Sequence, residues 1–542
     1  MLMRGLMMDR PLLTTGLIQF AAANHSDTAI VTHSVEGPIH RTTYAETYER
    51  IQKLANALVS LGVKPGDRVA TLANNTWRHL ELYYAIAGIG AISHTVNPRL
   101  GHEQLRYIIN HAEAKLLFFD PIYVDLVKSL SDDIPHIQQK IVLSDAAYAA
   151  KHCNMSDARI YEDLIAPFPD TFTWPEFDEN MAASLCYTSG TTGNPKGVLY
   201  SHRALVLHSY GSGPAAEITI DDVVLPIVPM YHVNAWGFPY TAPMFGASLV
   251  FTAQHTDGAN VFALMDSEGV TCSQAVPTVW MGLLDHMRKV GRKPKALERI
   301  MVGGAATPES LMDAYENEFG VTVNPVWGMT ETTPLAVVNT PKPKFKSLPA
   351  AERKKRKLRA GRIICGVEIR IVADDGTLLP NDGVTSGHVQ IRGPWVLSSY
   401  YKAEKPTLTA DGWFDTSDIG TLDADGSLQI TDRSKDVIKS GGEWISSVDL
   451  ENAAAGHPDI SNAAVIGIAH PKWQERPLLI CVAKGEKRPT LHELHAFLLQ
   501  KVPKWWLPDA VEFVDALPMG ATGKIQKTAL REQFRGYALK AE

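Results

Sequence analysis

Apolar positions in the first 180 residues alternate between helical and strand-like spacing. Over residues 44–61 they recur at helical intervals until Gly62, which predicts a helix. Residues 67–72 follow as a predicted strand, and three later apolar stretches have the same character: 115–119, 141–143 and 248–252. Strands that alternate with helices are typical of parallel sheets covered on both faces.

The pattern changes near residue 365. Short strands are predicted at 367–372, 388–392 and 428–431, separated by turn signals at 374–376 and 423–426. This spacing indicates a β-rich, antiparallel subdomain. After residue 435, helix, strand and helix patterns recur at 448–455, 460–468, 477–483 and 491–501, which predicts one small α+β domain.

Composition and charge narrow the class of protein. The 542 residues are 45% hydrophobic and 20% charged, which is typical of a globular chain. Fifty-two Lys and Arg against 59 Asp and Glu give a net charge of −7, so we expect no nucleic-acid partner. No apolar run approaches the ~18 residues of a membrane span, and residues 9–11 interrupt the N-terminal run too early for a signal peptide. Five scattered cysteines favour a reducing, cytoplasmic compartment.

The strongest local motif is a polar loop after the strand-like residues 182–186. It reads Thr188, Ser189, Gly190, Thr191, Thr192, Gly193, Asn194, Pro195, Lys196 and Gly197. Glycines let backbone N–H groups approach an anion, hydroxyls add donors, and lysine adds a positive charge. The composition favours a polyphosphate clamp over a flexible polar turn. It is not a Walker A loop, which requires Gly-Lys-Ser/Thr at its end.

This loop resembles the signature of the adenylate-forming superfamily, which includes acyl-CoA synthetases, luciferases and peptide-synthetase adenylation domains. Five further motifs of that family follow in order: Trp327-Gly328-Met329-Thr330-Glu331, Arg392 to Tyr400, Trp413 to Asp418, Asp432 to Asp436, and Thr522 to Ile525. Ser417 stands where the family has glycine. With the flanking patterns, the resemblance extends over essentially the whole chain.

The resemblance implies both a fold and a reaction. The fold is α/β: a large N-terminal domain (1–433) of stacked mixed sheets flanked by helices, with the β-rich subdomain at about 360–433, a hinge at 434–436, and a small mobile α+β C-terminal domain (437–542). The implied enzyme is an AMP-forming acid–thiol ligase. It would first convert a carboxylic acid and ATP into an acyl-adenylate and pyrophosphate. Coenzyme A would then react with the acyl-adenylate to give acyl-CoA and AMP.

Residue roles are implied motif by motif. The loop from Thr188 to Lys196 would hold the β- and γ-phosphates. Thr330 would contact the α-phosphate, and Glu331 would hold Mg²⁺ together with Thr188, since this cation prefers oxygen ligands. The adenine plane would lie against Trp327, Gly328 and Met329. Gly303, Gly304 and Ala305 would form the wall beside adenine and the acyl carbonyl. The ribose would be held by Asp418 and Arg433.

Two implied roles concern domain movement. Lys524 would bridge the carboxylate and the α-phosphate in the first step only. A rotation about Lys435 would then remove it and bring a second set of residues to the pantetheine tunnel: Gly441, Gly442, Glu443 and Trp444. A hinge is possible here because a few residues with altered dihedral angles are enough for such a motion. The alternative for Lys435 is an ordinary interdomain linker.

The acyl pocket is implied by residues 229–236. His232 would gate the pocket or orient the carboxylate, and a purely structural histidine is the alternative. Trp236 would shorten the acyl tunnel, unless it is a core residue. A basic run at 353–359 is interpreted as a solvated face, with the 3′-phosphate of coenzyme A as the alternative contact.

The substrate remains open among several acids. Residues 3–12 and 504–508 resemble bacterial medium-chain acyl-CoA synthetases, a group that includes 3-methylmercaptopropionate-CoA ligases, so this acid is the leading candidate and medium-chain fatty acids are the alternative. Transfer to a carrier protein is less favoured, because no carrier domain or serine attachment motif follows Lys524. A non-catalytic nucleotide-binding homologue would have lost Lys524, Thr330 or Glu331, and all three are present. Dimers are common in this superfamily, so a homodimer is also an expectation.

Overall fold

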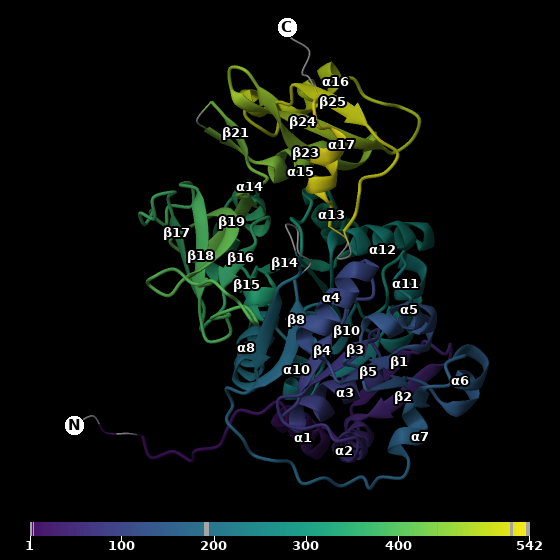
Figure 1. Ribbon diagram of the computed structural model, residues 1–542. Coiled ribbons are helices and arrows are strands. Elements are labelled where there is room, and N and C mark those ends of the chain that lie inside the picture. The colour runs from purple at the N-terminus through teal and green to yellow at the C-terminus, as the bar shows by residue number, and fades with distance from the viewer. Residues whose placement is uncertain (1–2, 4, 189–193, 442, 521–523, 538–542) are drawn as a thin grey trace.

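A computed structural model of the chain describes residues 3, 5–188, 194–441, 443–520 and 524–537. Its strands form three sheets, of thirteen, seven and five strands. Figure 1 places the five-stranded sheet with its helices above the rest of the molecule, and the antiparallel strands β17–β19 to one side. The predicted α/β architecture is therefore present.

The seven-stranded sheet carries the predicted strands of the first 180 residues. All neighbouring pairs are parallel except the last, an antiparallel hairpin. In spatial order the strands are β7 (Ala158–Ile160), β6 (Gln139–Val142), β5 (Leu116–Phe119), β3 (Arg68–Leu72), β4 (Ile92–Thr95), β8 (Ala182–Tyr187) and β9 (Gly197–Ser201). The hairpin β8–β9 holds both ends of the polar loop 188–196.

The thirteen-stranded sheet contains both a parallel part and the antiparallel, β-rich part that the sequence predicts as a separate subdomain. Its parallel part contains β13 (Arg299–Val302), β12 (Cys272–Ala275), β10 (Val223–Pro226), β11 (Ser248–Phe251) and β1 (Ala29–His33), with β2 (Ile39–Thr43) antiparallel at the edge. Its antiparallel part contains β17 (Glu368–Val372), β18 (Gly387–Arg392), β19 (Phe414–Leu422), β20 (Ser427–Arg433), β16 (Gly361–Ile363) and β15 (Leu335–Val338). Strand β14 (Thr322–Gly328) pairs parallel to β13 and antiparallel to β15, so hydrogen bonds run without interruption from one part to the other.

Helix α3 (Trp77–Gly88) contacts strands of both large sheets. All twelve of its residues are buried, including Arg78 and Glu81. Burial of charge is tolerated here because Arg78 pairs with Glu162 at 2.7 Å and Glu81 pairs with Arg50 at 2.6 Å. The neighbouring helix α2 (Tyr44–Ser60) begins at a capping box formed by Thr43 and Glu46, as such sequences favour.

The C-terminal unit is built on β22 (Glu443–Ile445), β21 (Ile438–Ser440), β24 (Gln474–Ala483), β23 (Ile460–His470) and β25 (Ala510–Phe513). Helices α15 (Ser447–Ala455), α16 (Leu491–Leu498) and α17 (Lys527–Gln533) pack beside them. This agrees with the helix and strand pattern predicted after residue 435.

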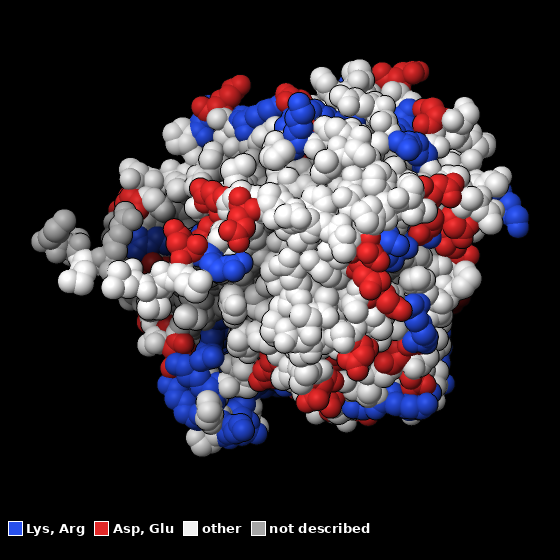
Figure 2. Space-filling view, turned by 90° about the horizontal axis from the view of Figure 1, so that it is seen from below, with Lys and Arg blue, Asp and Glu red and all other residues white. Residues whose placement is uncertain are grey.

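The face opposite the C-terminal unit has a broad uncharged centre, with acidic and basic residues mixed around its rim (Figure 2). The basic run 353–359 lies on and beside helix α14 (Ala350–Lys357), and four of its side chains pair with acidic residues of the chain: Lys354, Arg356, Lys357 and Arg359. Lys354 pairs with Glu309 and Asp313, and Arg359 pairs with Asp423. Within the described part of the chain, no helix is long and apolar enough to cross a membrane.

Candidate active site

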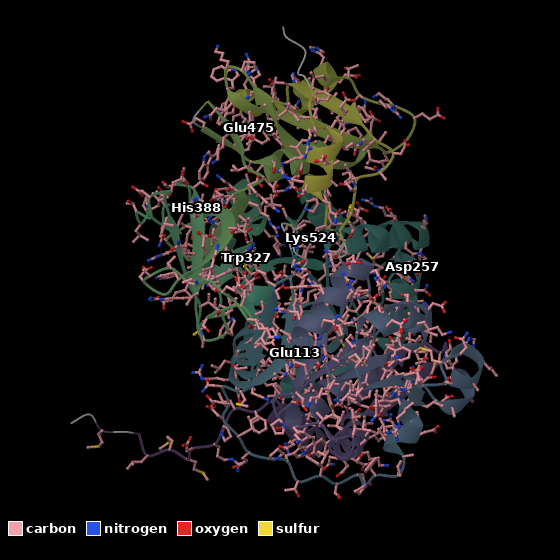
Figure 3. The ribbon with its side chains drawn as sticks, viewed as in Figure 1. Glu113, Asp257, Trp327, His388, Glu475 and Lys524 are labelled. Carbon is pink, nitrogen blue, oxygen red and sulfur yellow. The ribbon has the colours of Figure 1, made fainter. Side chains whose placement is uncertain are left out.

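A cleft of about 2980 Å³ lies between the C-terminal unit and the two large sheets. Figure 3 places Lys524 and Trp327 at this junction. The cleft brings together candidate residues that are far apart in the sequence: Thr188, Lys196, His232, Trp236, Gly304, Ala305, Trp327, Gly328, Met329, Thr330, Glu331, Asp418, Arg433, Lys435 and Lys524.

The ends of the phosphate loop are held by the hairpin β8–β9. The backbone N–H of Thr188 donates to the carbonyl of Lys196 at 2.9 Å, and the N–H of Lys196 donates to Thr188 Oγ1 at 3.2 Å. The Lys196 ammonium lies 4.8 Å from the centre of the Tyr400 ring. Five residues of the loop proposed to hold the phosphates lie outside the described residues: Ser189, Gly190, Thr191, Thr192 and Gly193.

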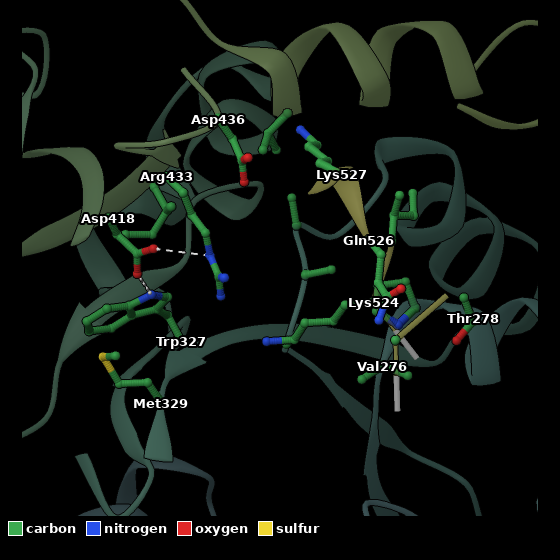
Figure 4. A pocket seen from close by; sticks show the side chains of 18 of the residues that line it. Val276, Thr278, Trp327, Met329, Asp418, Arg433, Asp436, Lys524, Gln526 and Lys527 are labelled. Atoms are coloured by element: carbon green, nitrogen blue, oxygen red, sulfur yellow. Dashed lines mark hydrogen bonds and ion pairs between the residues drawn. The ribbon is translucent and has the colours of Figure 1, made fainter. Parts of the chain in front are cut away.

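Trp327, Asp418 and Arg433 form one connected group on a wall of the cleft (Figure 4). Trp327 Nε1 donates to Asp418 Oδ2 at 3.0 Å, and Arg433 Nε lies 3.8 Å from Asp418 Oδ1. Asp418 and Arg433 are opposite each other in the pairing of β19 with β20, which explains why residues fifteen positions apart meet. Burial raises the pKa of Asp418, while Arg433 and Trp327 oppose that shift by favouring the carboxylate.

Thr330 and Glu331 follow β14 in a short 3₁₀ turn and are buried. The Tyr200 hydroxyl donates to the Thr330 carbonyl at 2.7 Å, and the Tyr400 hydroxyl donates to Glu331 Oε1 at 2.6 Å. Burial raises the pKa of Glu331, and both the Tyr400 hydroxyl and the charge of Lys196 oppose this shift. The Tyr400 hydroxyl therefore favours the ionised form of the carboxylate and fixes its direction.

The donor set fits Mg²⁺ bound together with a nucleotide. Within the described ranges, no cluster of three His, Cys, Asp or Glu residues forms a complete metal site. Glu331 lines the cleft, and its carboxylate accepts a hydrogen bond from Tyr400, whose ring lies against Lys196 of the phosphate loop. Mg²⁺ commonly takes one or two protein carboxylates and completes its shell with phosphate oxygens and water. Glu331 would hold the ion in this way, and Thr188 lies along the same side as a second oxygen donor.

Lys524 projects from the C-terminal unit into the cleft. In Figure 4 it lies beside Val276 and Thr278, across the pocket from Trp327 and Asp418. Its Cε is 3.5 Å from the position that a Cβ on Gly304 would occupy. Burial, followed by the charge of Arg433, lowers the pKa of Lys524 to about 8. A lowered pKa means that the buried amine holds its proton less tightly. An anion that enters the cleft stabilises the protonated, positively charged form.

The acyl candidate His232 precedes α9 (Val233–Trp236), a single left-handed turn, and the candidate Trp236 is its last residue. All four residues have positive φ, between 48° and 54°. A left-handed conformation costs L-residues roughly 1–2 kcal/mol each, so such a turn needs support from its surroundings. The tip of the Trp236 indole abuts Gly303, where a Cβ would lie 2.8 Å from Trp236 Cη2. Gly303 therefore packs against Trp236, and the described lining of the cleft includes Gly304 and Ala305 but not Gly303.

His232 lines the cleft as a neutral imidazole. Burial, and next the charge of Lys524, lowers its pKa to about 3. A neutral ring is able to donate or accept a hydrogen bond, but it supplies no positive charge to a carboxylate. This restricts the role expected for His232 to orientation or gating, and leaves Lys524 as the cation on that side.

A second set of candidates lies away from the cleft. Gly441 and Glu443 belong to the hairpin β21–β22 and are exposed, and the N–H of Gly441 donates to the carbonyl of Trp473 at 2.9 Å. Trp444 packs edge-on against His388 of β18 at 6.2 Å. Gly442 lies outside the described residues. The structure thus places Lys524 in the cleft and this hairpin outside it.

The motif order, the fold and the geometry of the cleft agree with comparisons to known proteins. The model of the AMP-binding enzyme family matches residues 18–401, and that of the AMP-binding enzyme C-terminal domain matches 449–524. This chain belongs to the AMP-binding enzyme family. The resemblance to the adenylate-forming enzymes is confirmed.

Two curated relatives of this AMP-binding enzyme match along almost their full length. A 3-methylmercaptopropionyl-CoA ligase of Ruegeria lacuscaerulensis is 48% identical, over 98% of this chain and 99% of its own. A medium-chain-fatty-acid–CoA ligase of Ectopseudomonas oleovorans is 43% identical, over 99% of both chains. The crystal structure of an anthranilate CoA ligase in complex with anthranoyl-AMP superposes with a TM-score of 0.86 at 24% identity, covering 97% of this chain and 98% of that one. The predicted fold and the predicted class, an AMP-forming acid–thiol ligase, are confirmed.

Three side chains that support the site were not predicted from the sequence: Tyr200, Tyr400 and Asn234. Neither the bond from Tyr200 to the Thr330 carbonyl nor the bond from Tyr400 to Glu331 has a local sequence signal, although Tyr400 ends the Arg392–Tyr400 motif. Asn234 was passed over because asparagine in an apolar segment has no distinctive spacing. Only the folded structure shows that Asn234 lies in the turn α9 and that its amide bonds Ser184 of β8.

Proposed function

We propose that this enzyme activates a short- or medium-chain carboxylic acid with ATP and transfers the acyl group to coenzyme A. The observation that carries the proposal is the convergence of Lys524, Glu331 and Asp418 in one cleft, each from a different motif. The ligase class follows from family membership. The acid, the residue roles and the use of Mg²⁺ are the proposed parts.

In the first half-reaction a carboxylate oxygen attacks the α-phosphorus of ATP. The bond from that phosphorus to the bridging oxygen breaks, and pyrophosphate leaves with the bonding electrons. Two anions must approach each other, so the site needs fixed positive charge where charge accumulates. We assign that role to Lys524 at the carboxylate and α-phosphate and to Lys196 at the departing phosphates. Mg²⁺ bound by Glu331 would neutralise phosphate charge further.

Nucleotide position is assigned to the group on the opposite wall. Asp418 has both carboxylate oxygens engaged with Trp327 and Arg433, which fixes the direction of its remaining lone pairs toward the cleft. Two ribose hydroxyls are suitable donors to such a carboxylate. The half-exposed Trp327 presents a flat face for adenine.

In the second half-reaction the thiol sulfur of coenzyme A attacks the acyl carbonyl. A thioester bond forms, the bond to the AMP oxygen breaks, and the thiol proton is released. Lys524 has no role in this step, because AMP leaves as a stable anion. We propose that the unit 437–542 rotates about Lys435, within a hinge at 434–436, and carries the Gly441–Trp444 hairpin toward the N-terminal domain 1–433.

For the acid, 3-methylmercaptopropionate is the leading candidate. Two observations support it: the Trp236 ring fills space beside Gly303 that a long chain would need, and the relative from Ruegeria carries this substrate in its name. A medium-chain fatty acid is the alternative. We also propose a cytoplasmic compartment, because all five cysteines are unpaired.

The test is pyrophosphate release with ATP and Mg²⁺ over acids from acetate to palmitate, including 3-methylmercaptopropionate and benzoate, with product masses determined with and without coenzyme A. The proposal predicts an acyl-CoA product and a preference for short acids. Pyrophosphate release without a thioester would instead indicate a carrier-protein acceptor. A folded protein that binds ATP but is silent across the panel would contradict catalysis of this reaction.

A further inference from the structure

The left-handed turn α9 lies between two parts of the site. On one side its residue Trp236 lines the cleft against Gly303. On the other side it packs on β8, the strand that leads directly into Thr188 and the phosphate loop. This turn is therefore the structural connection between the acyl pocket and the phosphate-binding hairpin.

Local sequence does not favour the conformation of this turn. Val233 has φ of 49° although its side chain is β-branched, and Ala235 and Trp236 are equally left-handed. Among ordinary residues, only asparagine and aspartate enter this region with ease. Strained backbone of this kind persists where surrounding contacts determine it, and such sites cluster at ligand pockets.

Asn234 supplies these contacts. Its Nδ2 donates to Ser184 Oγ at 3.2 Å, and its Oδ1 accepts from Cys186 Sγ at 3.3 Å. Tyr83 Oη of α3 lies 3.3 Å from the same Oδ1 and donates to the carbonyl of Met230, just before the turn. The side chain is 2% exposed, so water does not replace any of these partners.

The backbone of the turn is held from the other sheet as well. Gln274 Nε2 of β12 donates to the carbonyl of Ala235 at 3.3 Å. Asn75, which follows β3 in the same sheet as β8, accepts at Oδ1 from the N–H of Met230, three residues before the turn, at 2.6 Å. Asn234 is nonetheless the one residue of the turn whose side chain joins it to β8 in the hydrogen bonds that the described residues form.

We propose that Asn234 is a positioning residue that fixes the acyl pocket relative to the phosphate loop. The inference rests on the proposed function, in which a carboxylate oxygen must meet the α-phosphorus. Displacements of an ångström reduce such reactions strongly, since rate depends on the alignment of the reacting atoms. By holding α9 on Ser184 and Cys186, the Asn234 amide sets where Trp236 and His232 stand with respect to β8.

The experiment measures binding instead of turnover. The probe is the acyl-sulfamoyl adenosine of 3-methylmercaptopropionate, a stable mimic of the acyl-adenylate, and AMP is the reference ligand. Asn234→Ala removes all the hydrogen bonds of the amide side chain, to Ser184, Cys186 and Tyr83. Ala235 demonstrates that alanine can occupy the turn. We expect its Kd for the mimic to rise about tenfold and its Kd for AMP to stay within about twofold of wild type. Equal weakening of both ligands, or of neither, would overturn the proposal.

Asn339→Ala is the matched control. Asn339 is also a buried amide, and its Nδ2 donates to three backbone carbonyls, those of Arg356, Lys357 and Arg359. It lies outside the acyl pocket, so the variant should lose stability with an unchanged ratio of the two Kd values. A changed ratio in this control would make the effect of Asn234→Ala a general consequence of destabilisation and would overturn the assignment.

Ser184→Ala keeps the inference testable if Asn234→Ala does not fold. It removes the hydroxyl that contacts the Asn234 amide, together with the 3.2 Å bond from that hydroxyl to the carbonyl of Ser93. We expect the Kd for the mimic to rise about threefold with AMP binding unchanged, and an unaltered ratio would contradict the proposal. Turnover is measured separately: a wild type that binds the mimic but makes no acyl-CoA refutes the proposed function, while the ratio of Kd values still decides the role of Asn234.

Discussion

The hydrogen bond from Tyr400 to Glu331 provides a sharp test of the proposed metal site. Tyr400→Phe removes one oxygen atom and leaves the ring that lies under Lys196. The Glu331 carboxylate then loses its hydroxyl partner while it remains buried. Both its direction and its ionisation depend on that partner, so binding of Mg²⁺ with the nucleotide should weaken.

The size of the effect follows from the 2.6 Å contact. A hydrogen bond to a charged group contributes about 1.5–3 kcal/mol, and every 1.4 kcal/mol is tenfold. The Mg²⁺ concentration that gives half the maximal rate should therefore rise about 10- to 150-fold. Because the lost bond favoured the charged carboxylate, the pKa of Glu331 rises in the variant, and activity on the acid side should require a higher pH.

The assay is pyrophosphate release at saturating acid, titrated with Mg²⁺ at several pH values. Tyr401→Phe is the control because it also removes one tyrosine hydroxyl, from the next residue. The Tyr401 ring packs on His111, and its backbone N–H donates to the carbonyl of Gly197. Its Mg²⁺ dependence should match that of wild type. A folded Tyr400→Phe enzyme with the wild-type Mg²⁺ requirement would refute the assignment of Glu331 to the metal.

Three further predictions concern chain length, pH and backbone strain. Trp236→Gly should move the acid preference toward longer chains, measured as kcat/KM across the acid panel, and an unchanged profile would place the indole outside the pocket. Wild-type adenylation should decline above about pH 8 as Lys524 loses its proton, whereas Lys524→Arg should shift that decline to higher pH; a wild-type rate that stays flat there would contradict the lowered pKa. Ser417→Gly should stabilise the protein by about 0.5–1 kcal/mol in urea unfolding, because Ser417 has φ of 59° where glycine is unstrained, and a loss of stability would contradict this.

Much of the fold was predictable because its signals are local. The strand at 67–72 and the helix at 44–61 have the periodicity that their burial requires, and β3 and α2 match them closely. The apolar run 83–92 spans two elements of the structure. Helix α3 ends at Gly88, and β4 begins at Ile92. Periodicity does not separate a buried helix from a buried strand when every position is apolar.

The site divides in the same way. Lys524, Thr330, Glu331 and Asp418 stand in motifs that resemble those of the adenylate-forming enzymes, and that resemblance implied a shared nucleotide site. The left-handed turn at Val233–Trp236 was not predictable, because four consecutive ordinary residues with positive φ oppose local preference. The continuity of the β-rich part with the parallel sheet through β14 was likewise invisible, since strand pairing over long separations has no local signal.

The central claim is that Lys524 serves adenylation and not thioester formation. Its most direct test is Lys524→Ala with the two half-reactions measured separately: pyrophosphate release from acid and ATP, and acyl-CoA formation from supplied acyl-adenylate. Removal of one charge that stabilises a transition state typically costs about 10²- to 10³-fold. The account predicts a loss of that size in pyrophosphate release, with thioester formation within about twofold of wild type. Equal losses in both half-reactions would contradict it.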